Sequence, residues 1–372
     1  MRAVVYRGVN DLRLETVPVP RIGPGELLVK VAVCGVCPTD IKKIHYGTVP
    51  PPRIFGHETA GTIVKIGAGV NRLRGGRPQG LRNFKVGDRV ALHHHIPCLK
   101  CHFCRHRAFA QCETYKRTGI TAGFEPAGGG YAEYVRVMPF VLPGVVKIPA
   151  RNSFEEGAML EPVNTVLKAV KRLNLLPGDS VLVAGQGPIG LMFTKILQLA
   201  HVNVLATDLL ESRLKLARQF GARRASLASA INDSTVQRFA KSGGLDAAII
   251  AVPSDDAVTQ ALRLVRGGGQ VLLFAHTKRI SNSELRTPNS KFAVPHSPFS
   301  LDLASVCLDE KDLIGSYSAD FTIQQEAGRL VFSRRLDVRP LITHRFPLDQ
   351  TADAVQLASH PTPQSLKIIV TI

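Results

Sequence analysis

The fold is decided by one stretch of the sequence, VLVAGQGPIG, which occupies residues 181–190. Its first four residues are apolar and form a run too short for a helix, which is typical of a buried parallel strand. An amphipathic run, 191–200, follows the glycines and indicates a helix, and a second apolar run, 202–206, ends in Thr207 and Asp208. The pattern therefore predicts a strand, a glycine turn, a helix and a second strand, with an acid 18 residues after the last glycine.

The three glycines of this stretch have different physical roles. Gly185 permits a tight turn, Gly187 lets the backbone approach a pyrophosphate, and Gly190 lets the helix pack closely on the strand. The helix N-terminus offers unpaired N–H groups and a positive dipole end to phosphates, and an acid at the end of the second strand would accept hydrogen bonds from a ribose. The predicted dinucleotide-binding residues are Gly185, Gly187, Pro188, Ile189, Gly190 and Asp208.

The residues around Asp208 favour NAD over NADP. The carboxylate would repel a 2′-phosphate, and the next two residues, Leu209 and Leu210, carry no positive charge. Arg213 lies one turn into the following helix and is the feature that argues for a phosphate. We therefore predict NAD as the cofactor and include Arg213 among the cofactor-binding residues.

Outward from this unit, the pattern of the chain changes along its length. Residues 1–155 hold short alternating runs separated by Gly/Pro turns, which indicates a β-rich barrel or sandwich. Strands and helices then alternate over 156–318, which predicts a doubly wound parallel sheet of six strands. The segment 319–372 ends in a strand that we expect to return to the first domain. Two polar stretches, 69–84 and 277–300, look like added loops.

Composition limits the class of protein. With 372 residues the chain is long enough for two domains, and 45% hydrophobic and 20% charged residues are typical of a globular protein. Residues 1–6 look like a strand, not a signal peptide, and no apolar run approaches the ~18 residues that span a bilayer, so we predict a cytoplasmic protein without a membrane partner. The net charge of +18 would attract anions, but the basic residues are spread along the chain and indicate no specific nucleic-acid site.

Four cysteines, Cys98, Cys101, Cys104 and Cys112, lie within fifteen residues. Short spacers allow their sulfurs to face one tetrahedral ion, and four thiolates leave no open coordination position, so the site would be structural. Iron is the competing metal, but it usually takes paired knuckles that are far apart in sequence. We predict a structural zinc lobe over residues 93–115.

A second set of potential ligands lies earlier in the chain. Cys37 is followed by Pro38-Thr39-Asp40, and His57 stands beside Glu58. Thiolate, imidazole and carboxylate suit a zinc ion with one position left for water or substrate. Such an ion lowers the pKa of an alcohol, from which hydride can then leave.

In their order and spacing, these motifs resemble the zinc-containing medium-chain dehydrogenase/reductase superfamily. The resemblance covers essentially the whole chain and rests on VCGVCPTD (33–40), GHETAG (56–61), VGDRV (86–90), the four-cysteine lobe and the glycine motif. The pair Glu161-Pro162 resembles the branch of polyol (sorbitol-type) and threonine dehydrogenases, in which a glutamate replaces a cysteine ligand of alcohol dehydrogenases.

The resemblance implies an α/β protein of two domains. A GroES-like, β-rich catalytic domain would comprise residues 1–155 and be completed by 319–372, and a Rossmann domain that binds NAD would occupy 156–318. It also implies a homodimer or homotetramer, with the active site in the cleft.

Roles for individual residues follow from the same resemblance. Cys37 and His57 would bind the catalytic zinc, with either Glu58 or a water held by Glu161 completing its shell. The alternative for Glu58 is a carboxylate that orients its neighbours without binding the metal. Thr39 would pass the proton of the substrate hydroxyl outward.

Beyond Thr39 the chain departs from the family pattern. Many relatives have a histidine five residues after the ligand cysteine, where this chain has Lys42, and His45 lies three residues further on. We expect at least one of the histidines at 93–95 to face the substrate pocket. Cys34 and Cys307 are predicted to be small core residues.

The predicted function is the transfer of a hydride between NAD and a secondary alcohol or polyol, reversibly, by an enzyme with one catalytic and one structural zinc per chain. The alternatives are a dehydrogenase of a phosphorylated polyol or of an amino alcohol such as threonine. A metal-free quinone-reductase-like relative would lack Cys37, His57 and the cysteine lobe. A basic zinc protein that binds nucleic acid is a remote alternative, because no recognition helix is evident.

Overall fold

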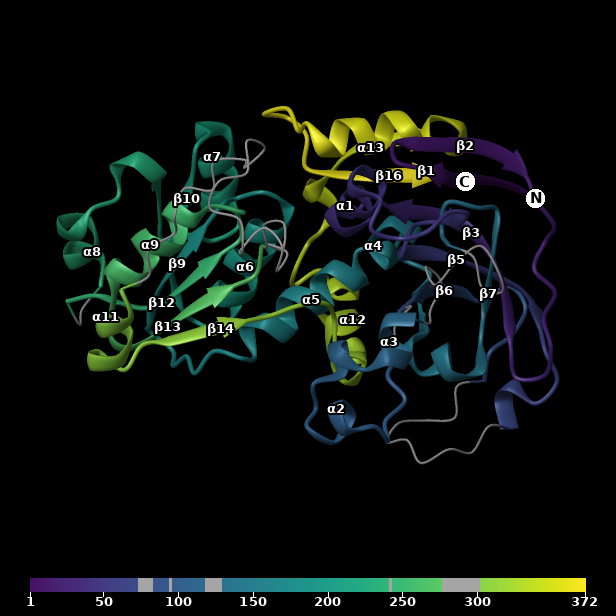
Figure 1. Cartoon of the computed structure of the whole chain (residues 1–372), viewed down its shortest axis with the longest axis horizontal. Helices are drawn as coiled ribbons and strands as arrows, with labels where there is room; N and C mark the ends of the chain where they lie inside the picture. The colour runs from purple at the N-terminus through teal and green to yellow at the C-terminus, as the bar shows by residue number, and fades with distance from the viewer. Residues whose placement is uncertain (73–82, 94–95, 118–128, 241–242, 276–301) are drawn as a thin grey trace, which may run out of the picture. The chain divides into compact units, whose positions relative to one another are not determined.

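The structure is a computed structural model of the chain, and it describes residues 1–72, 83–93, 96–117, 129–240, 243–275 and 302–372 (Figure 1). The predicted loop at 277–300 and most of the one at 69–84 lie outside the described residues. The chain forms two compact units. The first consists of Met1–Lys168 with Ser318–Ile372, and the second is Ala169–Tyr317.

The first unit is built on a seven-stranded sheet. Its strands are β3 (Leu27–Gly35), β5 (Glu58–Ile66), β6 (Arg89–Leu92), β7 (Tyr134–Val137), β8 (Val146–Lys147), β15 (Ile342–Pro347) and β16 (Lys367–Thr371). They follow the order β15-β16-β3-β5-β6-β8, and β7 also pairs with β3. The C-terminal strand β16 runs antiparallel to β3, so the end of the chain joins the N-terminal part in one sheet.

The register of this sheet positions the predicted ligands. β3 and β5 are antiparallel, with Gly35 opposite Glu58 and Cys34 opposite Thr59. Residues just past the end of β3 therefore lie beside residues just before the start of β5. Both strands are rich in β-branched and apolar residues and are largely buried, as central strands should be.

The first unit also contains a smaller sheet and, beside short 3₁₀ helices, several α-helices. The sheet has the order β2-β1-β4, from β1 (Arg2–Gly8), β2 (Asp11–Thr16) and β4 (Arg53–Ile54). The helices are α1 (Pro38–Tyr46), α2 (His102–Arg105), α3 (Glu113–Arg117), α4 (Phe154–Ala158), α5 (Leu160–Val170), α12 (Gln324–Phe332) and α13 (Thr351–Ser359). Helix α4 begins with a reciprocal cap, because Ser153 Oγ accepts from the Glu156 N–H and the Glu156 carboxylate accepts from the Ser153 N–H.

The second unit confirms the predicted doubly wound parallel sheet. Its strands are β9 (Ser180–Ala184), β10 (Asn203–Asp208), β11 (Arg224–Leu227), β12 (Leu245–Ile250), β13 (Val265–Leu273) and β14 (Asp312–Gly315). They follow the order β11-β10-β9-β12-β13-β14 and are all parallel. This is the dinucleotide-binding order, in which chain order reverses between the first and fourth strands, here β9 and β12.

Helices connect these strands, and the central strands are buried. The described helices are α6 (Pro188–Leu199), α7 (Glu211–Gln219), α8 (Asp233–Phe239), α9 (Asp255–Leu264) and α11 (Leu303–Leu308). Every residue of β9 is buried, which explains its continuous apolar sequence. Among the described residues, no helix of either unit is both long enough and apolar enough to cross a membrane.

Candidate active site

The first unit brings Cys37, His57 and Glu58 together. Cys37 is the residue before α1, His57 directly precedes β5, and Glu58 is its first residue. One ligand atom from each of the three lies within 4.8 Å of the others. A thiol, an imidazole and a carboxylate at this spacing fit a zinc ion and leave a coordination position for a further ligand.

Asp40 holds the ring of His57. Its Oδ2 lies 3.0 Å from His57 Nδ1 and accepts a hydrogen bond of 3.2 Å from the Gly56 N–H. Burial alone would lower the pKa of His57, but the charges of Asp40 and Cys37 outweigh it and raise that pKa well above its ordinary value. The contact assigns Nδ1 to the carboxylate, so Nε2 is the nitrogen suited to a metal.

Lys367 pairs with Glu58 in the same buried region. Its Nζ forms an ion pair with Glu58 Oε2 and donates a hydrogen bond of 2.8 Å to the carbonyl of Val36. Burial would lower the pKa of Lys367, but the charge of Glu58 and then that of Cys37 outweigh it and raise that pKa above its ordinary value. Lys367 opens the C-terminal strand β16, far from its partners in sequence.

Sequence reasoning assigned a role to neither Asp40 nor Lys367. For Asp40 a signal was present, since metal-binding histidines commonly donate their second N–H to a carboxylate and Asp40 follows the ligand cysteine by three residues. For Lys367 the sequence has no comparable signal.

Glu161 occupies the first turn of α5 and is buried. Desolvation raises its pKa to about 7, His57 acts to lower it, and Glu58 acts to raise it. Glu161 therefore interacts electrostatically with His57 and Glu58, but it is not one of the three residues whose ligand atoms lie within 4.8 Å of one another. Of the two glutamates proposed from the sequence, Glu58 is the one next to Cys37 and His57.

The residues considered for proton transfer all lie in α1, but His45 has partners of its own away from the cluster. Thr39 and Lys42 lie in α1 directly after Cys37, both half-buried; burial lowers the pKa of Lys42, and the Cys37 charge acts against it. His45 faces a different region: Nδ1 contacts Asn10 Oδ1, and Nε2 lies 2.8 Å from Ser359 Oγ.

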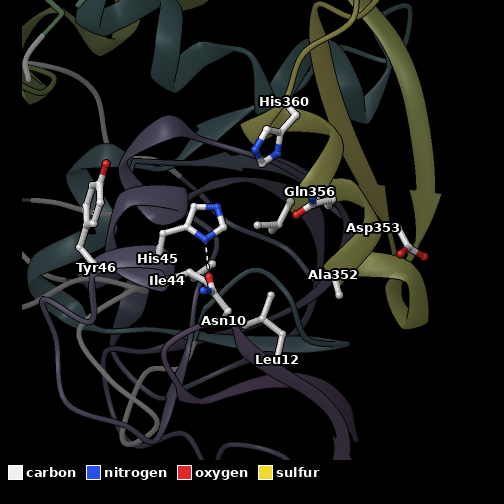
Figure 2. A pocket seen from close by; sticks show the side chains of 10 residues that line it. Asn10, Leu12, Ile44, His45, Tyr46, Ala352, Asp353, Gln356 and His360 are labelled. Carbon is white, nitrogen blue, oxygen red and sulfur yellow. Dashed lines mark hydrogen bonds between the residues drawn. The ribbon is translucent and has the colours of Figure 1, made fainter.

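A pocket of about 750 Å³ surrounds His45, and Figure 2 shows the histidine pointing into it opposite residues of α13. The pocket is lined by none of the cluster residues Cys37, His57 and Glu58. The pocket and His45 are therefore separate from the Cys37–His57–Glu58 cluster.

The structure also places His93 and the two cysteines predicted to be core residues, Cys34 and Cys307. His93 is fully buried, with its backbone N–H bonded to the Gly144 carbonyl at 3.2 Å, and residues 94–95 lie outside the described residues. Cys34 is buried as predicted, and burial raises its pKa to about 12. The prediction for Cys307 is wrong: it lies exposed in the short helix α11.

The four lobe cysteines also converge. Ligand atoms of Cys98, Cys101, Cys104 and Cys112 all lie within 4.8 Å of one another, and Cys101 Sγ is 3.5 Å from Cys104 Sγ. Backbone N–H groups of Lys100 and then Cys101 lower the pKa of Cys98 to about 6, and the Cys98 N–H itself faces Cys112 Sγ. Four sulfurs supported in this way fit a closed tetrahedral zinc site.

In the second unit the glycine turn follows β9, at the edge where the strand order reverses. Gly185 has φ +90°, a conformation that L side chains rarely adopt. A Cβ on Gly190 would collide with the carbonyl of Gly185, whereas a Cβ on Gly187 would meet nothing within 4 Å. Gly190 thus serves helix packing, and Gly187 leaves backbone open beside the N-terminus of α6, where Pro188 is the first residue and Ile189 the second.

Asp208 ends β10 and reaches back to this turn. Its Oδ2 accepts from the Gln186 N–H at 2.6 Å, and Oδ1 accepts from the Leu210 N–H at 3.0 Å. Arg213 is buried in α7; burial lowers its pKa, and the charge of Asp208 acts in the opposite direction. The acid and the glycines predicted to form one site are therefore neighbours in the structure.

Two family models match the chain. The alcohol dehydrogenase GroES-like domain matches residues 23–150, and the zinc-binding dehydrogenase domain matches residues 188–332. Sorbitol dehydrogenase of Bombyx mori is 29% identical, and the match covers 99% of this chain and 97% of that protein. Sorbitol dehydrogenase of Gallus gallus is 30% identical, and the match covers 95% of this chain and 92% of that protein. A putative zinc-binding dehydrogenase from Sinorhizobium meliloti, solved with NADP, has a TM-score of 0.81 at 25% identity, covering 100% of this chain and 99% of that one.

Proposed function

Because the chain belongs to the zinc-containing medium-chain dehydrogenase family, in its sorbitol dehydrogenase branch, we propose that it oxidises a vicinal diol or polyol at a secondary carbon, reversibly, with NAD as hydride acceptor. The single observation that carries the proposal is the convergence of Cys37, His57 and Glu58 within 4.8 Å. Relatives named for sorbitol, L-idonate and D-xylulose support a polyol as the substrate class.

The proposed chemistry divides among the residues of the first unit. A zinc ion held by Cys37, His57 and Glu58 would supply Lewis acidity toward the substrate hydroxyl. Asp40 keeps His57 in the tautomer that presents Nε2, and Thr39 would accept the hydroxyl proton and pass it outward. The Glu161 carboxyl would position water or a substrate hydroxyl beside the cluster.

The proposed cofactor is NAD, with Asp208 accepting hydrogen bonds from the ribose and opposing a 2′-phosphate. Gly185, Gly187, Pro188, Ile189, Gly190 and Arg213 complete the proposed site. The NADP in the Sinorhizobium structure belongs to that protein, and the choice for this chain rests on the Asp208 carboxylate at the glycine turn.

We also propose a domain division, a cellular location, an oligomeric state and a metal content. Met1–Lys168 with Ser318–Ile372 would form the catalytic domain and Ala169–Tyr317 the NAD-binding domain, so the first boundary falls later than the 155/156 division expected from the sequence. The enzyme would be a cytoplasmic homodimer or homotetramer, as the family resemblance implies. Zinc would be present twice per chain, with Cys98, Cys101, Cys104 and Cys112 as the ligands of the structural ion.

Steady-state kinetics test the proposed function. Polyols, sugar phosphates, amino alcohols and simple alcohols are compared with NAD⁺ by NADH absorbance, with zinc content measured in parallel. We expect a neutral polyol to have the highest kcat/KM, because polar groups of a pocket that lose water must be paired by the substrate. A higher value for ethanol or benzyl alcohol than for any polyol would refute the substrate class, and near-normal turnover by Cys37→Ser would refute the site.

A further inference from the structure

Lys367 stands out because it is a buried lysine, ion-paired inside the cluster, that the proposed chemistry does not use. It is 6% exposed, and its Nζ has two partners, the carboxylate of Glu58 and the carbonyl of Val36. Val36 directly precedes Cys37, so one side chain contacts both segments that supply the cluster. A buried charge is costly unless it is paired, and here the pair lies within the site.

The backbone of β3 is shaped to admit this pair. Gly35 lies opposite Glu58 in the β3–β5 register. A Cβ on Gly35 would collide with Glu58 Oε2 and would come within 3.0 Å of Lys367 Cε. The contact between Glu58 and Lys367 therefore depends on glycine at this position and is built into the sheet.

The Lys367–Glu58 ion pair lies among several buried carboxyl groups. Glu58, Glu161 and Asp40 place three carboxyl groups near Cys37, and all three are buried. Lys367 engages one of them directly, at Glu58 Oε2, which leaves that carboxylate one oxygen for another partner. Among the contacts of the described residues, no ion pair joins Lys367 to Glu161.

We propose that Lys367 is a positioning residue that holds one oxygen of Glu58 and so directs the carboxylate to the Cys37–His57 pair. Lys367 thereby fixes which oxygen of Glu58 is free to face Cys37 and His57. The inference rests on the proposed function only in treating this cluster as a zinc site.

Metal binding tests it without any substrate. Lys367→Met should weaken zinc binding at the Cys37 site about 10- to 100-fold, the usual cost of losing a group that orients a ligand. Cobalt(II) substitution reads the two sites separately, because a site with one thiolate and a site with four differ in charge-transfer absorption. We expect the Cys37-site spectrum to change and the four-cysteine spectrum to stay the same.

A double-mutant cycle separates positioning from a merely structural role. In a Glu58→Ala background, Lys367→Met should have little further effect on metal affinity, because the carboxylate that Lys367 holds is already gone. When Lys367→Met is combined with Glu161→Gln, the losses of metal affinity caused by the two substitutions should add. An equal effect of Lys367→Met with and without Glu58, or coupling to Glu161 instead, would overturn the proposal.

Lys311→Met is the matched control. The side chains of Lys311 and Lys367 are each 7% exposed. Lys311, in the second unit, pairs with Asp309 at 2.9 Å and donates to the Leu262 carbonyl at 3.0 Å. It should lower stability without changing the cobalt spectrum. If Lys367→Met does not fold, Lys367→Gln takes its place in the same cycle, with the same outcomes decisive. If Lys367 and Glu58 are coupled in metal affinity but the enzyme turns over no polyol, the proposed substrate is refuted and the role of Lys367 is not.

Discussion

Two carboxylates decide how the residues of the cluster behave. Asp40 contacts His57 at Nδ1, and Glu58 is held by Lys367. Both contacts orient a potential ligand, and both are buried, where an electrostatic interaction is stronger than in water. The cluster is therefore a set of potential ligands, each held in place by a charged neighbour, and losing that neighbour should weaken metal binding.

Asp40→Asn should reduce zinc affinity or turnover about 10- to 100-fold, since the amide keeps the shape but loses the charge that supports the histidine. Zinc retention against a chelator and kcat measure the effect. Asp88→Asn, which removes a carboxylate paired with Lys147 at 2.6 Å elsewhere in the same unit, is the control and should leave both unchanged. Full zinc content and full turnover in Asp40→Asn would contradict the role.

Glu161→Gln should also cost about 10- to 100-fold in activity or in zinc retention, because a carboxyl beside the cluster is replaced by a neutral amide of the same size. Initial rates and metal analysis of the purified variant decide this. Unchanged values of both would make Glu161 an ordinary residue of α5.

At the scale of elements, two short segments have opposite requirements. The glycine turn between β9 and α6 needs open backbone, as the empty space around Gly187 shows. The cysteine lobe has little apolar core of its own and needs cross-linking, and Tyr115 of α3 joins it to the rest of the unit through Ser318 Oγ at 2.5 Å and the Ala319 carbonyl at 3.2 Å.

Asp208→Ala should narrow the preference for NAD over NADP, because the carboxylate that opposes a 2′-phosphate is removed while Arg213 remains. The ratio of kcat/KM values for the two cofactors is the measurement. Affinity for NAD should also fall, since the Gln186 N–H loses its acceptor. Comparable values for both cofactors in the wild-type enzyme would show that Asp208 does not select NAD.

Cys101→Ser and Cys37→Ser should fail in different ways. The first should lower Tm or the soluble yield, because a closed zinc site contributes free energy of folding. The second should abolish turnover while the fold and NADH binding remain. Thermal denaturation and NADH fluorescence titration separate the two, and a reversed pattern would exchange the assignments of the two sites.

At the scale of the whole molecule, the first unit is assembled from both ends of the chain. Strand β16 pairs with β3, and Arg334, just after α12, pairs with Glu156 of α4 at 3.0 Å. Burial would raise the pKa of Glu156, but Arg334, the Ser153 N–H and Asn152 together hold it below its ordinary value of 4.5. The tail is thus fastened by a charged contact as well as by the sheet.

This contact predicts how stability depends on pH. The pKa of Glu156 is lower in the folded than in the unfolded protein, so its stabilisation is complete above the unfolded value and is lost as pH falls through the folded value. Glu156→Gln should lower the free energy of unfolding by about 2 kcal/mol at neutral pH, the scale of a hydrogen bond to a charged group. Urea unfolding of both proteins should give a difference that shrinks below about pH 4.5. A difference independent of pH would exclude the carboxylate as its source.

The sequence by itself determined the features whose residues are close along the chain. The glycine turn with Asp208 and the lobe from Cys98 to Cys112 are recognisable because local spacing sets their geometry. The alternation of strands and helices likewise determined the parallel sheet of the second unit, since crossover connections leave few topologies open.

Only the tertiary structure decided the contacts between distant segments. It placed Glu58 rather than Glu161 beside Cys37, gave Asp40 to His57, and directed His45 to Asn10 and Ser359. Lys367 and Val36 are 331 residues apart, and no local pattern marks their contact. The physical reason is strand pairing: the register of β3 with β5 and β16 sets which side chains meet, and that register depends on the packing of the whole sheet.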